Sequence, residues 1–154
     1  MKKISFLILT VCLGMIFNQN TRGEDSLTRD IELLKNGDDE TREDSARRLG
    51  DYREKEAVDA LCEALHDTNE DVVEEALASL GRIGNSDAVE KIVPVLSHDD
   101  IGIRRSAVRA LKKIGDPRAL PALEKMLDEN KNPFIERPIE AAIESLKAAQ
   151  NAGN

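Results

Sequence analysis

A repeat of 31 residues constrains the fold of this 154-residue chain more than any other feature. The stretch ALASLGRIGNSDAVEKIVPVL, from Ala76 to Leu96, returns in similar form as AVRALKKIGDPRALPALEKML, from Ala107 to Leu127. The matched positions are alanine, leucine, isoleucine and glycine. A repeat of this length indicates one supersecondary unit used several times, in which each unit buries its apolar face against the next.

Each unit is predicted to contain two helices. Ile103, Ala107 and Leu111 recur every four residues and form one apolar face. Leu120, Leu123 and Leu127, at spacings of three and four, form another in the second half of that unit. Two short helices cannot bury such faces alone, whereas stacked units can. The sequence therefore predicts an all-α fold, an α-α superhelix of about four repeats, in preference to a four-helix bundle.

The residues between the expected helices repeat as well. Equivalent positions before the first helices hold residues that can cap a helix N-terminus: Asn69, Asp100 and Asn132. Gly115 can end a first helix in the left-handed conformation, and Asp116 can then cap the second helix. The first unit has Arg53 and Glu54 in these places, so we expect its turn to differ. Pro94 lies inside a second helix and predicts a kink there.

The segment DDIGIRRSAVRALKKIGDPRALPALEKML resembles the HEAT repeat, in the short form that is also found in phycobilisome lyases. The resemblance extends from about Asp38 to Lys147. It implies a right-handed superhelix with the first helices on the convex side and the second helices on the concave side. It also implies that Arg104 pairs with an aspartate of an inter-helix turn, here Asp116, and that Val73 interrupts this series in the second unit.

The N-terminus differs from the repeats. Lys2 and Lys3 precede an apolar run over residues 4–17 and a short polar stretch, which is typical of a secretory signal peptide. We expect residues 1–23 to be cleaved after Gly23 and the protein to be exported, to the periplasm or the extracellular space. Retention as a membrane anchor is the alternative. Residues 24–37 are expected to form a capping helix, residues 38–148 the repeats and residues 149–154 a flexible tail.

Charge disfavours two classes of partner. The formal net charge of the whole chain is −8, and cleavage would remove Lys2, Lys3 and Arg22 without any acidic residue. A strongly acidic protein repels phosphate backbones and anionic membranes. After cleavage only Tyr52 and Phe134 remain as aromatic residues, too few to stack bases. We therefore expect neither nucleic acid nor, once the signal peptide is removed, a membrane as partner.

Residue types that carry chemistry are few. His66 and His98 occupy different registers of the repeat, so they do not suggest a metal site. Cys62 aligns with Val93, which predicts a buried and unreactive thiol. No phosphate-binding glycine loop or nucleophile-histidine arrangement is visible. We expect a protein that is not an enzyme, with no catalytic residue, cofactor or bound metal.

Charge patterning gives the candidate binding site. The outer faces of the first two second helices are acidic, whereas the first helix of the third unit is basic. The candidate partner-binding residues, called here the acidic surface, are Glu56, Asp59, Glu63, Asp87 and Glu90. These patterns predict a non-catalytic scaffold whose acidic surface binds a basic segment of a partner protein. The alternative is an accessory subunit or lyase-like component related to phycobilin lyases.

Overall fold

The computed structural model describes residues 26–130 and 132–152, and the expected signal peptide lies outside them. These residues contain helices and no strand. None of their helices is long and apolar enough to cross a membrane. A helix over residues 26–36 comes first. The elements after it are α2 (Asp39–Leu49), α3 (Lys55–Ala64), α4 (Glu70–Ile83), η1 (Ser86–Ala88), α5 (Val89–Ile92), η2 (Val93–Ser97), α6 (Ile101–Ile114), η3 (Pro117–Ala119), α7 (Leu120–Glu129) and α8 (Pro133–Ala152).

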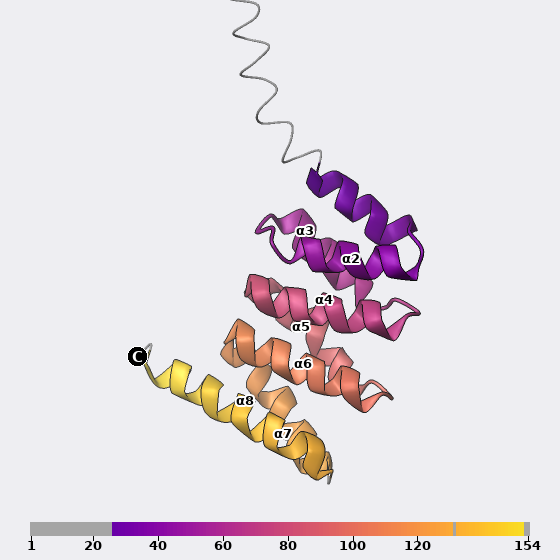
Figure 1. The fold of residues 1–154 in the computed structure, drawn as a ribbon. Helices are drawn as coiled ribbons and strands as arrows, with labels where there is room; N and C mark the ends of the chain where they lie inside the picture. Colours follow the sequence, from indigo (N-terminus) through magenta and orange to yellow (C-terminus); the bar gives the residue numbers. More distant parts are fainter. Residues whose placement is uncertain (1–25, 131, 153–154) are drawn as a thin grey trace, which may run out of the picture.

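The helices form a stack of two layers (Figure 1). Helices α2, α4, α6 and α8 lie side by side in one layer, and each packs on the next. Helices α3, α5 and α7 lie behind them in the second layer. This is the all-α solenoid that the sequence predicts. Its last unit differs from the others because α8 is a single long helix, which packs against both α6 and α7.

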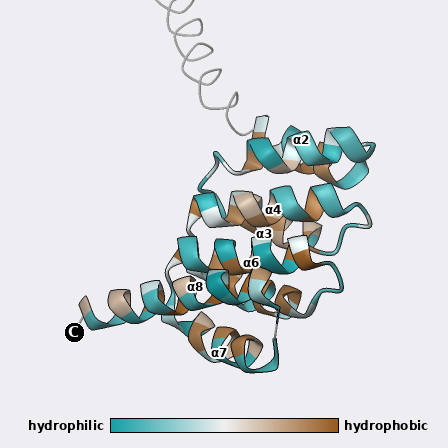
Figure 2. Cartoon of the chain, turned by 60° about the horizontal axis from the view of Figure 1, so that its bottom comes forward, coloured by the Kyte–Doolittle hydropathy of each residue, from teal (hydrophilic) through white to brown (hydrophobic). Residues whose placement is uncertain are grey.

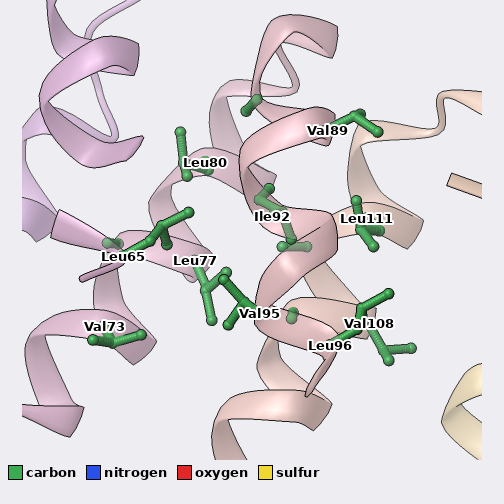
Figure 3. Close-up of a cluster of buried hydrophobic side chains, with 14 of the residues drawn as sticks. Leu65, Val73, Leu77, Leu80, Val89, Ile92, Val95, Leu96, Val108 and Leu111 are labelled. Atoms are coloured by element: carbon green, nitrogen blue, oxygen red, sulfur yellow. The ribbon is translucent and has the colours of Figure 1, made fainter. Parts of the chain in front are cut away.

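The core runs through the stack between the two layers. Leu77 of α4, Ile92 of α5 and Leu111 of α6, from two neighbouring units, are completely buried and belong to one cluster of apolar side chains (Figure 3). Hydrophobic and hydrophilic residues alternate along each helix (Figure 2), so that one side of every helix faces the core. Small residues let neighbouring helices approach closely. A Cβ atom at Gly81 of α4 would lie 3.1 Å from the Cα atom of Ala110 in α6.

The expected caps are confirmed. The Asn69 side chain accepts hydrogen bonds from the amides of α4, that of Asp100 accepts one from Ile103, and that of Asn132 accepts one from Phe134. Gly84 and Gly115 end α4 and α6 with φ angles of 73° and 77°, in the left-handed region. The following Asn85 and Asp116 cap η1 and η3.

Two expected irregularities are also present. The first-unit turn does differ, because Gly50 after α2 has a right-handed conformation and Glu54 forms no side-chain cap on α3. At Pro94 the second helix of the next unit stops being α-helical after only four residues and continues as the 3₁₀ helix η2. At the C-terminus, residues 149–152, which we expected in a flexible tail, continue α8 as exposed helix.

Polar bonds connect successive units. The buried Ser79 hydroxyl of α4 donates to the Ala46 carbonyl of α2 over 2.8 Å. Arg53 donates to the Ile83 carbonyl at the end of α4, and Arg118 donates to the Ser86 carbonyl. Cations at helix C-termini are favourable because the last carbonyl groups carry partial negative charge. These bonds fix the register of one unit on the next.

Candidate functional site

The five acidic-surface residues lie on consecutive elements of the second layer. Three are on α3, Asp87 is on η1 and Glu90 is on α5. All five are exposed. Helices α3 and η1 pack against each other, so this surface is continuous from the first unit to the second.

Basic side chains partly neutralise the acidic surface. Lys55 forms an ion pair of 2.6 Å with Asp59, and its pKa is raised by this hydrogen bond. Lys35 pairs with Glu63 over 3.1 Å, and Arg118 lies 3.8 Å from Glu90. The charge pattern of α3 and α5 alone does not reveal these cations, because Lys35 and Arg118 come from other helices. A basic ligand would therefore have to displace exposed internal ion pairs, which are individually weak.

A second polar arrangement joins the first two units more firmly. The guanidinium group of Arg42 in α2 donates from Nε and Nη2 to the two carboxylate oxygens of Asp67, each over 2.8 Å. Both side chains are largely buried, at 15% and 13% exposure. Arg42 also donates from Nη1 to the Gly37 carbonyl. The hydrogen bond from Arg42 holds the pKa of Asp67 below its ordinary value. Such two-pronged pairs are among the stronger polar contacts in proteins.

The expected pairing of Arg104 with Asp116 is wrong. The Asp116 carboxylate binds Arg118, two residues away, over distances of 2.7 to 3.1 Å. Arg104 instead donates from Nη1 to the carbonyl groups of His98 and Asp99, over 2.6 and 2.8 Å. Val73, at the same repeat position in the second unit, is buried. The repeat could have identified Arg42 as the equivalent of Arg104, because Arg42 precedes Arg104 by two repeat lengths.

Arg104 lines an open groove between η2 and α7. The groove has a volume of about 940 Å³ and apolar walls that include Val93, Leu96, Ala122 and Met126. Lys125 and Glu129 of α7 also line it and lie 3.8 Å apart.

Two other basic residues of α6 lie beside acidic residues of α2 and α4, because Arg109 and Lys113 share a groove with Glu43, Asp71, Glu74 and Glu75. Arg105, Arg109, Lys112 and Lys113 form no ion pair within the part of the chain that the structure describes. The first three line a groove of about 430 Å³ against α8, with Pro138 and Ala141 opposite. The basic residues of α6 thus belong to a first layer of mixed charge, whereas the acidic surface lies on the second layer.

Cys62 lies on α3 beside the acidic surface, and His98 lies in the turn before α6. His98 uses Nδ1 to accept the amide of Asp100, which makes it part of a turn. Among residues 26–130 and 132–152, no three His, Cys, Asp or Glu side chains are grouped as metal ligands. Cys62 is half-buried, where we expected full burial, and its repeat equivalent Val93 is half-buried too. Burial and the nearby Asp59 charge raise the pKa of the Cys62 thiol to about 11.

Comparison with known proteins agrees with this geometry. A family model described as HEAT repeats matches residues 13–80 and 66–147. No curated protein matches. A solved structure of the complex of CpcE and CpcF of phycocyanin lyase from Nostoc sp. PCC7120 is 30% identical, with a TM-score of 0.63, and the match covers 74% of this chain and 52% of that one.

Two further solved structures share the fold. Human deoxyhypusine hydroxylase is 21% identical, with a TM-score of 0.74, over 88% of this chain and 48% of that one. An engineered protein is 22% identical, with a TM-score of 0.59, over 80% and 63%. The chain therefore spans about half the length of the first two structures that it matches.

Proposed function

Because the chain belongs to the HEAT-repeat family, we propose that it is a non-catalytic scaffold that binds another protein through the acidic surface. The observation that carries the proposal is the continuous exposure of the five acidic residues along α3, η1 and α5. The helices that hold them are fixed by the buried core. A preformed surface of this kind loses little conformational freedom on binding.

The partner is expected to offer a basic segment. Its lysine or arginine side chains would exchange with Lys55 and Arg118 at the carboxylates of Asp59 and Glu90. Because these groups are exposed, added salt should weaken the attraction, and the charges should speed association more than they tighten the complex. The Nostoc structure, which is a complex of two proteins, supports a protein partner.

Affinity capture with paired charge reversals tests the proposal. The purified protein is immobilised, partners are captured from the native host, and binding is remeasured for Asp59→Lys/Glu90→Lys and for Arg105→Glu/Arg109→Glu. We expect the first pair of reversals to abolish capture of a partner that the second pair retains. If only the reversal on α6 abolishes capture, the acidic surface is not the binding site.

A second candidate function is an accessory role in a lyase, and the 30% identity to the phycocyanin lyase complex favours it. Visible absorbance of the bilin-free phycocyanin polypeptide incubated with a bilin, with and without this chain and a partner subunit, distinguishes the two. A covalent coloured product that requires this chain would replace the scaffold proposal.

Export is part of the proposal. The basic start and short apolar run of residues 1–23 support it. Intact-mass measurement of the protein from its native host should give a chain that begins at Glu24, in the periplasm or the medium. A full-length mass in the membrane fraction would show that the segment is retained as an anchor.

A further inference from the structure

We propose that the groove between η2 and α7 binds an acidic side chain of a partner protein, with Arg104 as the residue that pairs with its carboxylate and the apolar walls holding a neighbouring apolar side chain. This inference rests on the proposed protein-binding function and adds a second chemical feature of the partner. In the first unit, the same repeat position is held by Arg42, which already pairs with a carboxylate.

Arg42 and Arg104 are equivalent in position and in part of their bonding. Both follow a helix-capping aspartate by four residues, Asp38 and Asp100. Both donate from Nη1 to a carbonyl group just before that cap: Arg42 to Gly37, and Arg104 to Asp99. In each case Nε and Nη2 are left for another acceptor.

The second acceptor differs between the two units. In the first unit Asp67, two residues before the cap Asn69, takes the Nε and Nη2 of Arg42 while it also accepts the Asn69 amide. In the third unit Asn130 stands two residues before the cap Asn132 and accepts its amide in the same way, over 2.9 Å. Asn130 is neutral, and Nε and Nη2 of Arg104 have no bond to any described residue.

The Arg104 guanidinium therefore has two donors, Nε and Nη2, available for the kind of acceptor that Asp67 offers to Arg42 in the first unit. Glu129 is the acidic side chain that lines the groove, but it is exposed and lies beside Lys125. With Arg104 and Lys125 against Glu129, the groove carries an excess positive charge on a chain of net charge −8. Arginine favours a bidentate carboxylate in this geometry.

Nuclear magnetic resonance of the Arg104 Nε–Hε group gives a direct test on the protein itself. The probe is N-acetyl-leucyl-aspartyl amide, whose one carboxylate is the aspartate side chain. The matched control is the corresponding asparagine peptide. We expect a saturable shift of the Arg104 signal with the aspartyl probe and none with the asparaginyl probe. Equal responses to both, or no saturable response, would overturn the proposal.

Three variants distinguish a binding role from a structural one. Arg104→Gln should weaken probe binding by about tenfold or more, because a charged hydrogen-bonded pair is lost. Asn130→Asp should supply an internal carboxylate, as Asp67 does, so it should weaken probe binding while it moves the free Arg104 signal toward that of Arg42. Arg105→Gln, on the same helix but outside the groove, should bind normally. Unchanged binding by Asn130→Asp would contradict the assignment.

The source of the carboxylate is tested with a third probe. N-acetyl-leucine carries only a chain-end carboxylate, and we expect it to bind more weakly than the aspartyl probe. If this probe binds and the aspartyl probe does not, the ligand of the groove is the C-terminal carboxylate of a partner and not an acidic side chain. Because the probes require no native partner, failure here is distinguishable from failure to capture a partner through the acidic surface.

Discussion

At the scale of single residues, we expect the carboxylate of Asp67 to contribute more to the free energy of unfolding than the exposed acidic groups do. It is nearly enclosed and receives two donors from Arg42 and one from the Asn69 backbone. A buried donor that loses its acceptor costs more than an exposed one, because water cannot fully replace the partner.

We therefore predict that Asp67→Asn lowers the free energy of unfolding by about 1–3 kcal/mol at neutral pH. The pKa of Asp67 in the folded state lies below its ordinary value of 3.8. Its stabilising effect is thus complete above that value and is lost as the pH falls through the folded-state pKa. Urea unfolding against pH measures this, and the gap between wild type and variant should narrow in acid. Asp59→Asn, at an exposed pair, is the control and should change little.

Cys62 is predicted to react slowly although it is only half-buried. Its pKa of about 11 leaves very little thiolate at neutral pH, and the thiolate is the reactive form. In the full-length chain with Cys12→Ser, which leaves Cys62 as its one cysteine, the rate of labelling by a disulfide reagent should lie well below that of the urea-unfolded chain. It should continue to rise with pH beyond 9.0, the ordinary value for a thiol. A native rate equal to the unfolded rate would contradict this.

Residue-level prediction from sequence succeeded where partners are local. The caps at Asn69 and Asp100 depend on amides two or three residues away, so the repeat pattern is enough to predict them. Pairing of Arg104 with Asp116 was wrong because Arg118 reaches that carboxylate from two residues away. The bond between Arg42 and Asp67 depends on two helices meeting at one turn, which periodicity alone does not reveal.

At the scale of elements, the contact between α4 and α6 depends on the absence of a side chain at Gly81. The nearest atom to an added Cβ is the backbone Cα of Ala110, which cannot rotate away. Alanine is intrinsically better than glycine in a helix by about 1 kcal/mol. Overpacking commonly costs about 1–3 kcal/mol, which is enough to reverse that preference.

Gly81→Ala is therefore predicted to destabilise the protein, by up to about 2 kcal/mol once the helix preference is included. Ala78→Gly provides the comparison, because Ala78 is exposed on the same helix. That change should also destabilise, by about 1 kcal/mol, through helix propensity alone. Thermal unfolding of both variants measures the effect, and a stabilised Gly81→Ala would mean that the two helices can separate slightly.

The spacing of apolar residues predicted where the helices begin and end, but it did not predict the charge of the surface. The spacing of Val89, Ile92 and Leu96 fits a helical face, and Pro94 marks where the α-helix ends. The sequence of each second helix alone suggests more negative charge on the acidic surface than the fold leaves there, since Lys35 and Arg118 reach it from other elements. The groove was not predicted either, because it requires the relative placement of η2, α6 and α7.

At the scale of the whole molecule, the stack is held by contacts between neighbours. Helix α6 packs mainly on α4, α8 and η2, and α2 packs on α4 and α3. In such an arrangement, a change in one unit weakens the two interfaces that this unit forms with its neighbours. The stability of distant units changes only through these interfaces.

Leu111→Ala tests this property, because Leu111 is fully buried in α6 at the centre of these interfaces. Loss of the side chain leaves a cavity and should cost about 2–5 kcal/mol. Hydrogen exchange should then show the largest loss of protection in α4, α6 and α8. The helix over residues 26–36 lies at the other end of the stack and should change least, because it is linked to α6 only through the units between them. Leu27→Ala, at a half-buried site in that first helix, should give the reverse pattern. Equal losses along the chain in both variants would show that the stack unfolds as one unit, and the neighbour description would then be wrong.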